Sequence, residues 1–183
     1  MKFILIGGGQ VNSVEGKIHL VKANKYIQKS GSNILFISAA SDDAQGYINT
    51  VKNEFSSLNF KVLKSTEISS AKLFFDWADI IYLGGGSTEK LMHFLKKINF
   101  ISLLNEKHFI VGFSAGAIAV CKQGYSLDKN KLFEGFGLLP FSVTPHFIEG
   151  SSVPKLDSPL NLHNGNSLVV DKTGNILEKI IDK

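Results

Sequence analysis

Short apolar runs alternate with helix-like segments through the first two thirds of the chain. Five runs stand out: KFILIG (2–7), NILFIS (33–38), FKVLKS (60–65), ADIIYLGGG (78–86) and HFIVGF (108–113). Nearly continuous apolar runs of this length are typical of strands that are buried on both faces of a sheet. Their alternation with helices predicts a three-layer α/β fold, in which a largely parallel sheet is flanked by helices.

The remaining segments complete this prediction. We expect helices around 14–29, 44–57, 87–98 and 115–122, a strand at 141–147, and a hairpin at 167–182 that turns at DKTG. The chain has 183 residues, 44% of them hydrophobic, and lacks a linker rich in Pro, Ser or Gly. A chain of this size can build one sizeable core, so we predict a single domain over residues 1–183.

Cysteine content and the first residues bear on the compartment. The single cysteine, Cys121, excludes an internal disulfide framework and has no Cys/His cluster around it, which favours a reducing compartment and no metal site. The opening MKFILIGGGQ has an apolar run that is too short for a signal peptide or a membrane span. We therefore expect a cytoplasmic protein that does not associate with membranes.

The basic residues do not indicate a nucleic-acid site. All 20 are lysines, they are scattered along the chain, and arginine, the residue best suited to bidentate guanine contacts, is absent. We expect no nucleic-acid partner, and the net charge of +4 says little more.

Glycine-bearing junctions follow three of the predicted strands, at GGGQ (7–10), GGGSTEK (84–90) and GFSAG (112–116). The carboxyl ends of parallel strands share one edge of a sheet, where ligand sites collect, so these junctions can converge. GFSAG has the G-x-S-x-G pattern of a nucleophile elbow, in which a strained strand-to-helix turn exposes the serine. Ser114 is thus a candidate nucleophile, and the N–H of Ala115, at the helix start, can bind an oxyanion. The alternative is a turn whose small residues serve packing.

The GGGSTEKL stretch matches neither the P-loop nor the dinucleotide-binding pattern. Its glycine backbone can instead supply a second oxyanion donor. The alternative is a tight turn followed by a helix cap at Ser87.

A serine nucleophile needs a base, and the chain has five histidines. His19 and His93 lie in helical stretches and His108 at the start of a strand, whereas His163 lies in a loop and stays open. His146 follows an apolar run and a proline, at a point where a later strand would end. It is the preferred base, although a structural histidine would also explain it.

YLGGGSTEKLM, GFSAGA and GLLPFSVTPHF, in this order and at these separations, resemble the aspartyl dipeptidase (peptidase E) and cyanophycinase family of serine peptidases. The resemblance covers about four fifths of the chain, to Phe147. It implies a class I glutamine amidotransferase-like (flavodoxin-like) fold and peptide hydrolysis through an acyl-enzyme, without metal or cofactor.

The same resemblance implies roles for individual residues. Ser114 would be the nucleophile and His146 the base, and the N–H groups of Ala115 and Gly85 would form the oxyanion hole. We expect the neighbours of Gly85 in its loop to bind the substrate, namely Gly84, Gly86 and Ser87.

The sequence departs from the family pattern in two places. The segment IEGSSVPKLDSPLN (148–161) is short and lacks the arginines that bind an acidic substrate side chain, and Lys155 is the one cation in it. In LHNGNSLVV, Asn164 stands where the family has a catalytic glutamate. Exchanging the acid of a serine triad for its amide lowers turnover about 10⁴-fold, because the imidazole is held in the wrong tautomer.

Glu149, Asp157 and Asp171 are other carboxylates that could fill the third catalytic position. We predict a serine-type hydrolase of short peptides, which could act as a homodimer. Two alternatives stay open: a weakly active or inactive homologue that binds a small peptide or metabolite, and an esterase or acyl-transfer enzyme. A glutamine amidotransferase is disfavoured because Ser114 replaces the required thiol.

Overall fold

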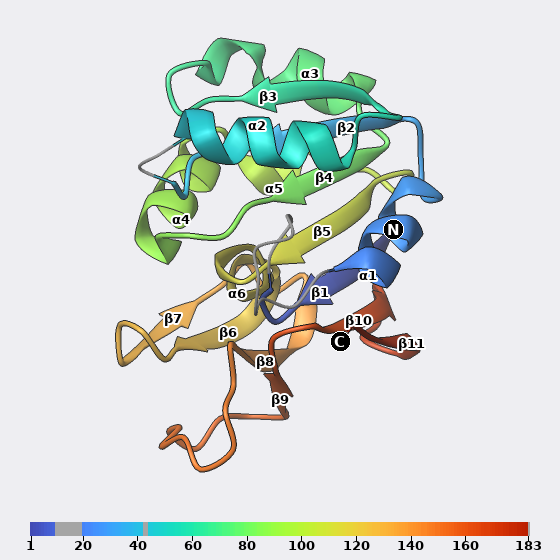
Figure 1. Cartoon of the computed structure of the whole chain (residues 1–183). Helices are drawn as coiled ribbons and strands as arrows, with labels where there is room; N and C mark the ends of the chain where they lie inside the picture. Colours follow the sequence, from blue (N-terminus) through green and yellow to red (C-terminus); the bar gives the residue numbers. More distant parts are fainter. Residues whose placement is uncertain (10–19, 42–43, 183) are drawn as a thin grey trace.

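The computed structural model describes residues 1–9, 20–41 and 44–182, and it has the predicted three-layer α/β architecture (Figure 1). The strands of the main sheet are β1 (Lys2–Ile6), β2 (Asn33–Ile37), β3 (Asn59–Leu63), β4 (Ile80–Leu83), β5 (Phe109–Phe113), β10 (Asn166–Asp171) and β11 (Ile176–Ile181). The helical elements are α1 (Val21–Gln28), α2 (Ala44–Glu54), the 3-10 turn η1 (Ile68–Ser70), α3 (Ala71–Trp77), α4 (Thr88–Lys97), α5 (Phe100–Leu103) and α6 (Ala115–Val120).

The main sheet has the order β11-β10-β1-β5-β4-β2-β3. The five strands from β1 to β3 in this order are parallel, and the β10–β11 hairpin adds antiparallel to β1. The central strands are apolar throughout because both of their faces are covered: all five residues of β5 and all four of β4 are buried.

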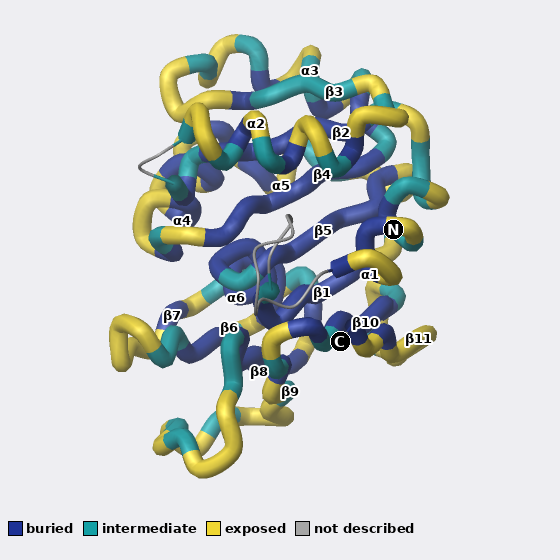
Figure 2. The backbone as a smooth tube through the Cα atoms, viewed as in Figure 1, coloured by how far each residue is buried: buried dark blue, intermediate teal, exposed yellow. Residues whose placement is uncertain are grey.

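Two hydrophobic clusters fill the spaces between sheet and helices. One joins α1 and α2 to alternate strand residues such as Ile4 and Ile34. The other joins α3, α4, α5 and α6 to the strand residues whose side chains point to the opposite face of the sheet, such as Leu5 and Leu35. Figure 2 shows the resulting buried band through the centre of the molecule. The sheet is thus the middle layer, and its strand ends carry the loops of the site.

A second sheet follows α6 and was not predicted. It consists of β6 (Cys121–Ser126), β7 (Lys131–Glu134), β8 (Leu139–Pro145) and β9 (Pro159–Leu162), in the order β7-β6-β8-β9. The predicted helix at 115–122 ends at Val120, because Cys121 is extended and pairs with Leu139 of β8. The predicted strand at 141–147 corresponds to β8, which belongs to this second sheet and not to the main sheet.

The other predicted elements lie within a few residues of those observed. The hairpin turns at Asp171–Gly174 as predicted, where the Gly174 N–H donates to the Asp171 carbonyl at 3.0 Å. Helices α3 and α5 were not predicted. Of the helix expected at 14–29, residues 14–19 lie outside the described part of the chain, and the rest is α1.

Candidate active site

Parallel pairing brings the glycine-bearing junctions together at one edge of the sheet. Ile6 of β1 pairs with Phe113 of β5, and Leu83 of β4 pairs with Gly112 of the same strand. The chain therefore leaves these three neighbouring strands at the same level, and the loops that follow them meet there, as the strand pattern predicted.

Ser114 occupies the turn between β5 and α6 with φ 51° and ψ −103°, a conformation that non-glycine residues rarely adopt. Small neighbours make this turn possible. A Cβ at Gly112 would lie 2.9 Å from the Ala117 backbone, and one at Gly116 would lie 2.3 Å from the Leu83 carbonyl oxygen. The strained turn and its crowded flanks have the geometry of a nucleophile elbow.

His146 reaches Ser114 from the end of β8. Its Nε2 lies 2.8 Å from the Ser114 Oγ, a distance that suits a serine hydroxyl donating to an imidazole base. His146 itself has a φ of 54°, and its backbone N–H donates to the Gly7 carbonyl at 2.8 Å. A backbone hydrogen bond to the residue that follows β1 thus holds His146 in position beside Ser114.

Asn164 completes a chain of three side chains. Its Oδ1 lies 2.7 Å from the His146 Nδ1. With the amide oxygen in this position, Nδ1 carries the proton and donates it, which leaves Nε2 free to accept from Ser114. A Cβ at Gly8 would lie within 2.3 Å of both partners of the His146–Asn164 contact. Glycine at this position is therefore required for the two side chains to meet.

The three carboxylates considered as alternatives have other surroundings. The Glu149 Oε1 lies 3.7 Å from the Nε2 of His163, and Asp157 pairs at 3.1 Å with a lysine of β6. Asp171 accepts hydrogen bonds within its own hairpin turn. Among the residues that the structure describes, the side chain that meets Nδ1 of the active-site imidazole is the amide of Asn164.

Two other described histidines occupy different parts of the fold, since His108 precedes the first residue of β5 and His93 lies on α4. His108 is buried, its Nε2 lies 3.0 Å from the Phe75 carbonyl oxygen, and its Nδ1 accepts from the Asn105 N–H at 3.2 Å. This burial lowers its pKa. His93 is exposed on α4, and His19 lies outside the described residues. Cys121, the one thiol of the chain, is buried, and burial raises its pKa.

The two predicted oxyanion donors are in different states. The Ala115 N–H is at the first position of α6, where it has no partner within the helix. The Gly85 N–H instead donates to the hydroxyl of Tyr47, on α2, at 3.1 Å. Burial raises the pKa of Tyr47 to about 12, so this hydroxyl stays neutral. Gly85 can therefore bind an oxyanion only when its contact with Tyr47 opens.

The rest of the glycine loop is tightly packed. A Cβ at Gly84 would lie 3.0 Å from the ring atoms of Phe36 and Tyr47, and one at Gly86, with φ +123°, would lie 2.4 Å from the Ala40 carbonyl oxygen. Ser87 caps α4, because its side chain accepts from the Lys90 N–H at 3.3 Å. The sequence raised this helix cap as the alternative to a role of Ser87 in the site. Contacts of Gly84, Gly86 and Ser87 with substrate stay a prediction.

A small cavity of about 30 Å³ adjoins Ser114 and His146. Its other lining residues are Gly86, Thr88, Ile118, Ser126 at the end of β6, Leu127 and Asp128 of the β6–β7 turn, and Pro145. This volume is close to that of one water molecule in the liquid. This space beside the serine is therefore large enough for one small group.

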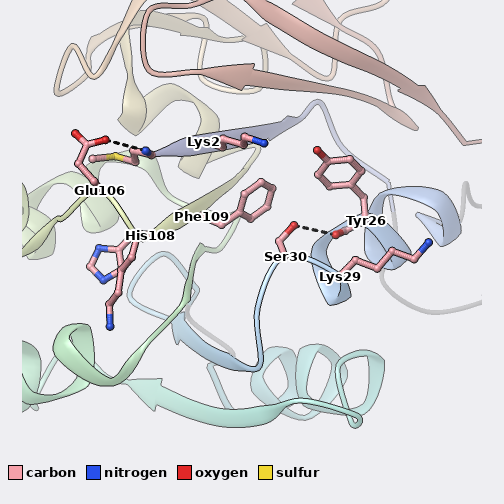
Figure 3. A pocket seen from close by; sticks show the side chains of 9 residues that line it. Lys2, Tyr26, Lys29, Ser30, Glu106, His108 and Phe109 are labelled. Atoms are coloured by element: carbon pink, nitrogen blue, oxygen red, sulfur yellow. Dashed lines mark hydrogen bonds and ion pairs between the residues drawn. The ribbon is translucent and has the colours of Figure 1, made fainter.

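A larger cavity of about 540 Å³ lies elsewhere (Figure 3). Lys2 and Phe109, at the starts of β1 and β5, line it together with Tyr26 and His108. It is therefore at the amino ends of the parallel strands, whereas Ser114 follows the carboxyl end of β5. Its position separates it from the serine–histidine pair.

Within the described residues, no three or more His, Cys, Asp or Glu side chains gather in an arrangement that could hold a metal ion. No helix among them is long and apolar enough to cross a membrane.

Comparison with known proteins points to one family. The family model of peptidase family S51 matches residues 3–177. The uncharacterized peptidase YgaJ of Bacillus subtilis is 29% identical over 164 residues, covering 80% of this chain and 68% of that protein. A peptidase E of Haemophilus influenzae is 28% identical over 150 residues, covering 75% of this chain and 64% of that protein. The chain thus matches about two thirds of the length of these relatives.

A solved structure supports the fold. A crystal structure of a Listeria monocytogenes protein, provisionally named peptidase E, superposes with a TM-score of 0.67. The superposition covers 100% of this chain and 97% of that chain, at 17% sequence identity. The glutamine amidotransferase-like α/β fold expected from the sequence is thereby confirmed.

Proposed function

Because the chain belongs to peptidase family S51, a family of serine-type peptidases, we propose that it hydrolyses peptide bonds of short peptides, in the manner of a dipeptidase. The observation that carries this proposal is the 2.8 Å contact between the Ser114 Oγ and the His146 Nε2. It lies at a strained turn with a helix N-terminus beside it, where a developing negative charge is stabilised.

In the proposed reaction, the Ser114 oxygen attacks the carbonyl carbon of the scissile bond while His146 Nε2 takes the hydroxyl proton. The charge that develops on the carbonyl oxygen is bound by the Ala115 N–H, joined by Gly85 once Tyr47 releases it. Collapse of the tetrahedral intermediate breaks the C–N bond, and Nε2 returns the proton to the leaving amine. Water then attacks the acyl-enzyme, again losing its proton to Nε2, and Ser114 is regenerated as the acid product leaves.

Asn164 has a positioning role in this scheme. Its Oδ1 accepts from the Nδ1–H of His146 and thereby holds the tautomer in which Nε2 is a base. A neutral amide stabilises the imidazolium less than a carboxylate does. We therefore expect slower turnover than in a serine triad with an acid, although the tautomer is the productive one.

The substrates are proposed to be short because the family that the sequence motifs resemble includes dipeptidases. The test is hydrolysis of a dipeptide and tripeptide panel that includes Asp-X, followed by mass spectrometry, with Ser114→Ala as the matched control. Cleavage by the wild type that the variant loses supports the proposal. Cleavage that persists in Ser114→Ala refutes Ser114 as the nucleophile.

The neutral amide at Asn164 favours a second candidate. An ester needs less help than an amide to expel its leaving group, so a weakened triad could serve an esterase or acyl-transfer enzyme, or be retained in a binding protein. Matched ester and amide substrates separate these cases. Faster ester cleavage that needs His146 favours the esterase, and binding without Ser114-dependent turnover favours the binding protein.

A further inference from the structure

The larger cavity at the amino ends of the parallel strands, which we call the amino-end cavity, can hold a ligand of its own (Figure 3). Lys2 and Phe109 are the first residues of β1 and β5 and pair with each other, whereas Ser114 follows the other end of β5. Tyr26 and Lys29, at the end of α1, line the cavity as well. Its volume of about 540 Å³ lies within the range of small-molecule sites, about 300–1,000 Å³.

Lysine ammonium groups set the charge of the amino-end cavity. Lys2 and Lys29 are exposed, and neither forms an ion pair with a carboxylate of the described residues. Of the described residues that line the cavity, Glu106 is the one carboxylate, and it pairs at 3.1 Å with Lys172 and at 3.0 Å with the amino group of Met1. Figure 3 shows Glu106 at the opposite end of the cavity from Lys29. Two ammonium groups are therefore available to an anion.

A second cavity, also of about 540 Å³, adjoins the first, since Tyr26 and Lys29 line both. The described residues around the two cavities include six lysines and two glutamates, an excess of four positive charges that equals the net charge of the whole chain. Two of these lysines, Lys22 and Lys107, donate to backbone carbonyl oxygens at 2.8 and 2.7 Å, which leaves their charge uncompensated. The summed field on this side of the molecule therefore attracts anions.

The amino-end cavity also has an aromatic wall. The ring centroids of Tyr26 and Phe109 lie 6.0 Å apart, with their planes inclined by 35°. Phe109 is buried, whereas Tyr26 is half-buried and lines both cavities, so part of its ring is accessible to a ligand. Burial, and to a smaller extent Glu178, raises the pKa of Tyr26. Its hydroxyl therefore keeps its proton and can donate a hydrogen bond to an anion.

We propose that the amino-end cavity binds a nucleoside diphosphate, with the base against the Tyr26 ring and the phosphates at Lys2 and Lys29. Any base can stack on an aromatic side chain, because every base has a π face. Lysine binds phosphate as a point charge, so the site does not depend on a glycine-rich loop. A bare anion would leave the aromatic wall unused, and a neutral ring would leave the lysines without a counter-charge. The cavity is separate from Ser114, so this inference does not depend on the proposed function.

Calorimetry with the wild-type protein tests the proposal. The probes are the diphosphates of adenosine, guanosine, cytidine and uridine, with inorganic pyrophosphate and the four nucleosides as partial ligands, in a buffer without divalent cations. We expect a diphosphate to bind about tenfold or more tightly than pyrophosphate, because stacking of the base adds to the phosphate contacts. Its affinity should fall as salt is added, since salt screens exposed charges. Binding by none of the four diphosphates, or binding no tighter than that of pyrophosphate, would overturn the proposal.

Substitutions locate the site. Lys2→Gln and Lys29→Gln should each weaken diphosphate binding about three- to tenfold. The matched control is Lys96→Gln, an exposed lysine of α4, which packs on the opposite face of the sheet from α1, and it should leave binding unchanged. Equal effects of Lys96→Gln and Lys29→Gln would mean attraction by charge alone and would overturn the site.

The aromatic contact has its own pair of variants. Tyr26→Leu should lower the affinity for the diphosphate to near that for pyrophosphate, because it removes the stacking surface. Tyr26→Phe keeps the ring and should retain most of the difference between the two ligands. Loss of this difference in Tyr26→Phe as well, or its persistence in Tyr26→Leu, would refute stacking on Tyr26.

Discussion

Replacing Asn164 by aspartate tests most directly how the contact between Asn164 and His146 contributes to turnover. The change keeps the length of the side chain and an oxygen at the position that now lies 2.7 Å from the His146 Nδ1, and it adds a negative charge. That charge stabilises the imidazolium formed as Ser114 attacks. Turnover should therefore rise.

The size of the gain follows from the exposure of the site. Two unit charges about 4 Å apart interact by about 1 kcal/mol in water and about 4 kcal/mol at an effective dielectric constant near 20. Asn164 is exposed, so the lower part of this range applies, about 1–2 kcal/mol after screening. This corresponds to a rise in kcat of about 5- to 30-fold.

The assay is the pH dependence of kcat and kcat/KM for a cleaved dipeptide, in wild type and Asn164→Asp. Because a carboxylate favours the imidazolium, the acidic limb of the variant's profile should also move to higher pH. A gain near 10⁴-fold would refute our reasoning, since it would mean that the wild-type amide holds the imidazole in the wrong tautomer. No gain at all would refute the expectation that a charge at this position stabilises the imidazolium.

Three other substitutions test particular contacts. Gly8→Ala should lower kcat at least tenfold, by forcing apart the imidazole–amide contact against which its Cβ would clash, and a circular dichroism spectrum like that of the wild type would exclude unfolding as the cause. Tyr47→Phe should raise kcat about two- to tenfold, because it frees the Gly85 N–H to bind the oxyanion. Urea denaturation should show a free energy of unfolding lower by about 1 kcal/mol. A fall in kcat would contradict the idea that Tyr47 competes with the oxyanion for this N–H. The pKa of Asp171 is lowered, first by the Thr173 hydroxyl and then by the Asn175 side chain, so its stabilising contribution is complete above its unfolded-state pKa, about 4, and is lost on acidification. Asp171→Asn should accordingly reduce the thermal midpoint at pH 7 more than at pH 3, and an equal reduction at both would refute this role.

The main sheet could be predicted because its strands carry a local signal. A central parallel strand is buried on both faces, so β1, β4 and β5 are apolar along their length and read as strands without knowledge of their neighbours. The second sheet has no such signal. Its edge strand β7, KLFE, has one buried residue, and β9, PLNL, likewise has one. β7 is a strand because it pairs with β6. β9 is a strand because it pairs with β8, from which residues 146–158 separate it in the sequence.

The sequence by itself determined the class of fold and the elbow at Ser114, because apolar runs and small residues around a turn are local properties of the chain. It also pointed to Asn164 in place of an acid. Only the tertiary structure decided that the Asn164 side chain contacts the His146 imidazole, that the Gly85 N–H donates to the Tyr47 hydroxyl, and that Asp128 lines the cavity. Each of these depends on segments that are not adjacent in the sequence. The packing of sheet and helices brings them together, and this leaves no periodic trace in the sequence.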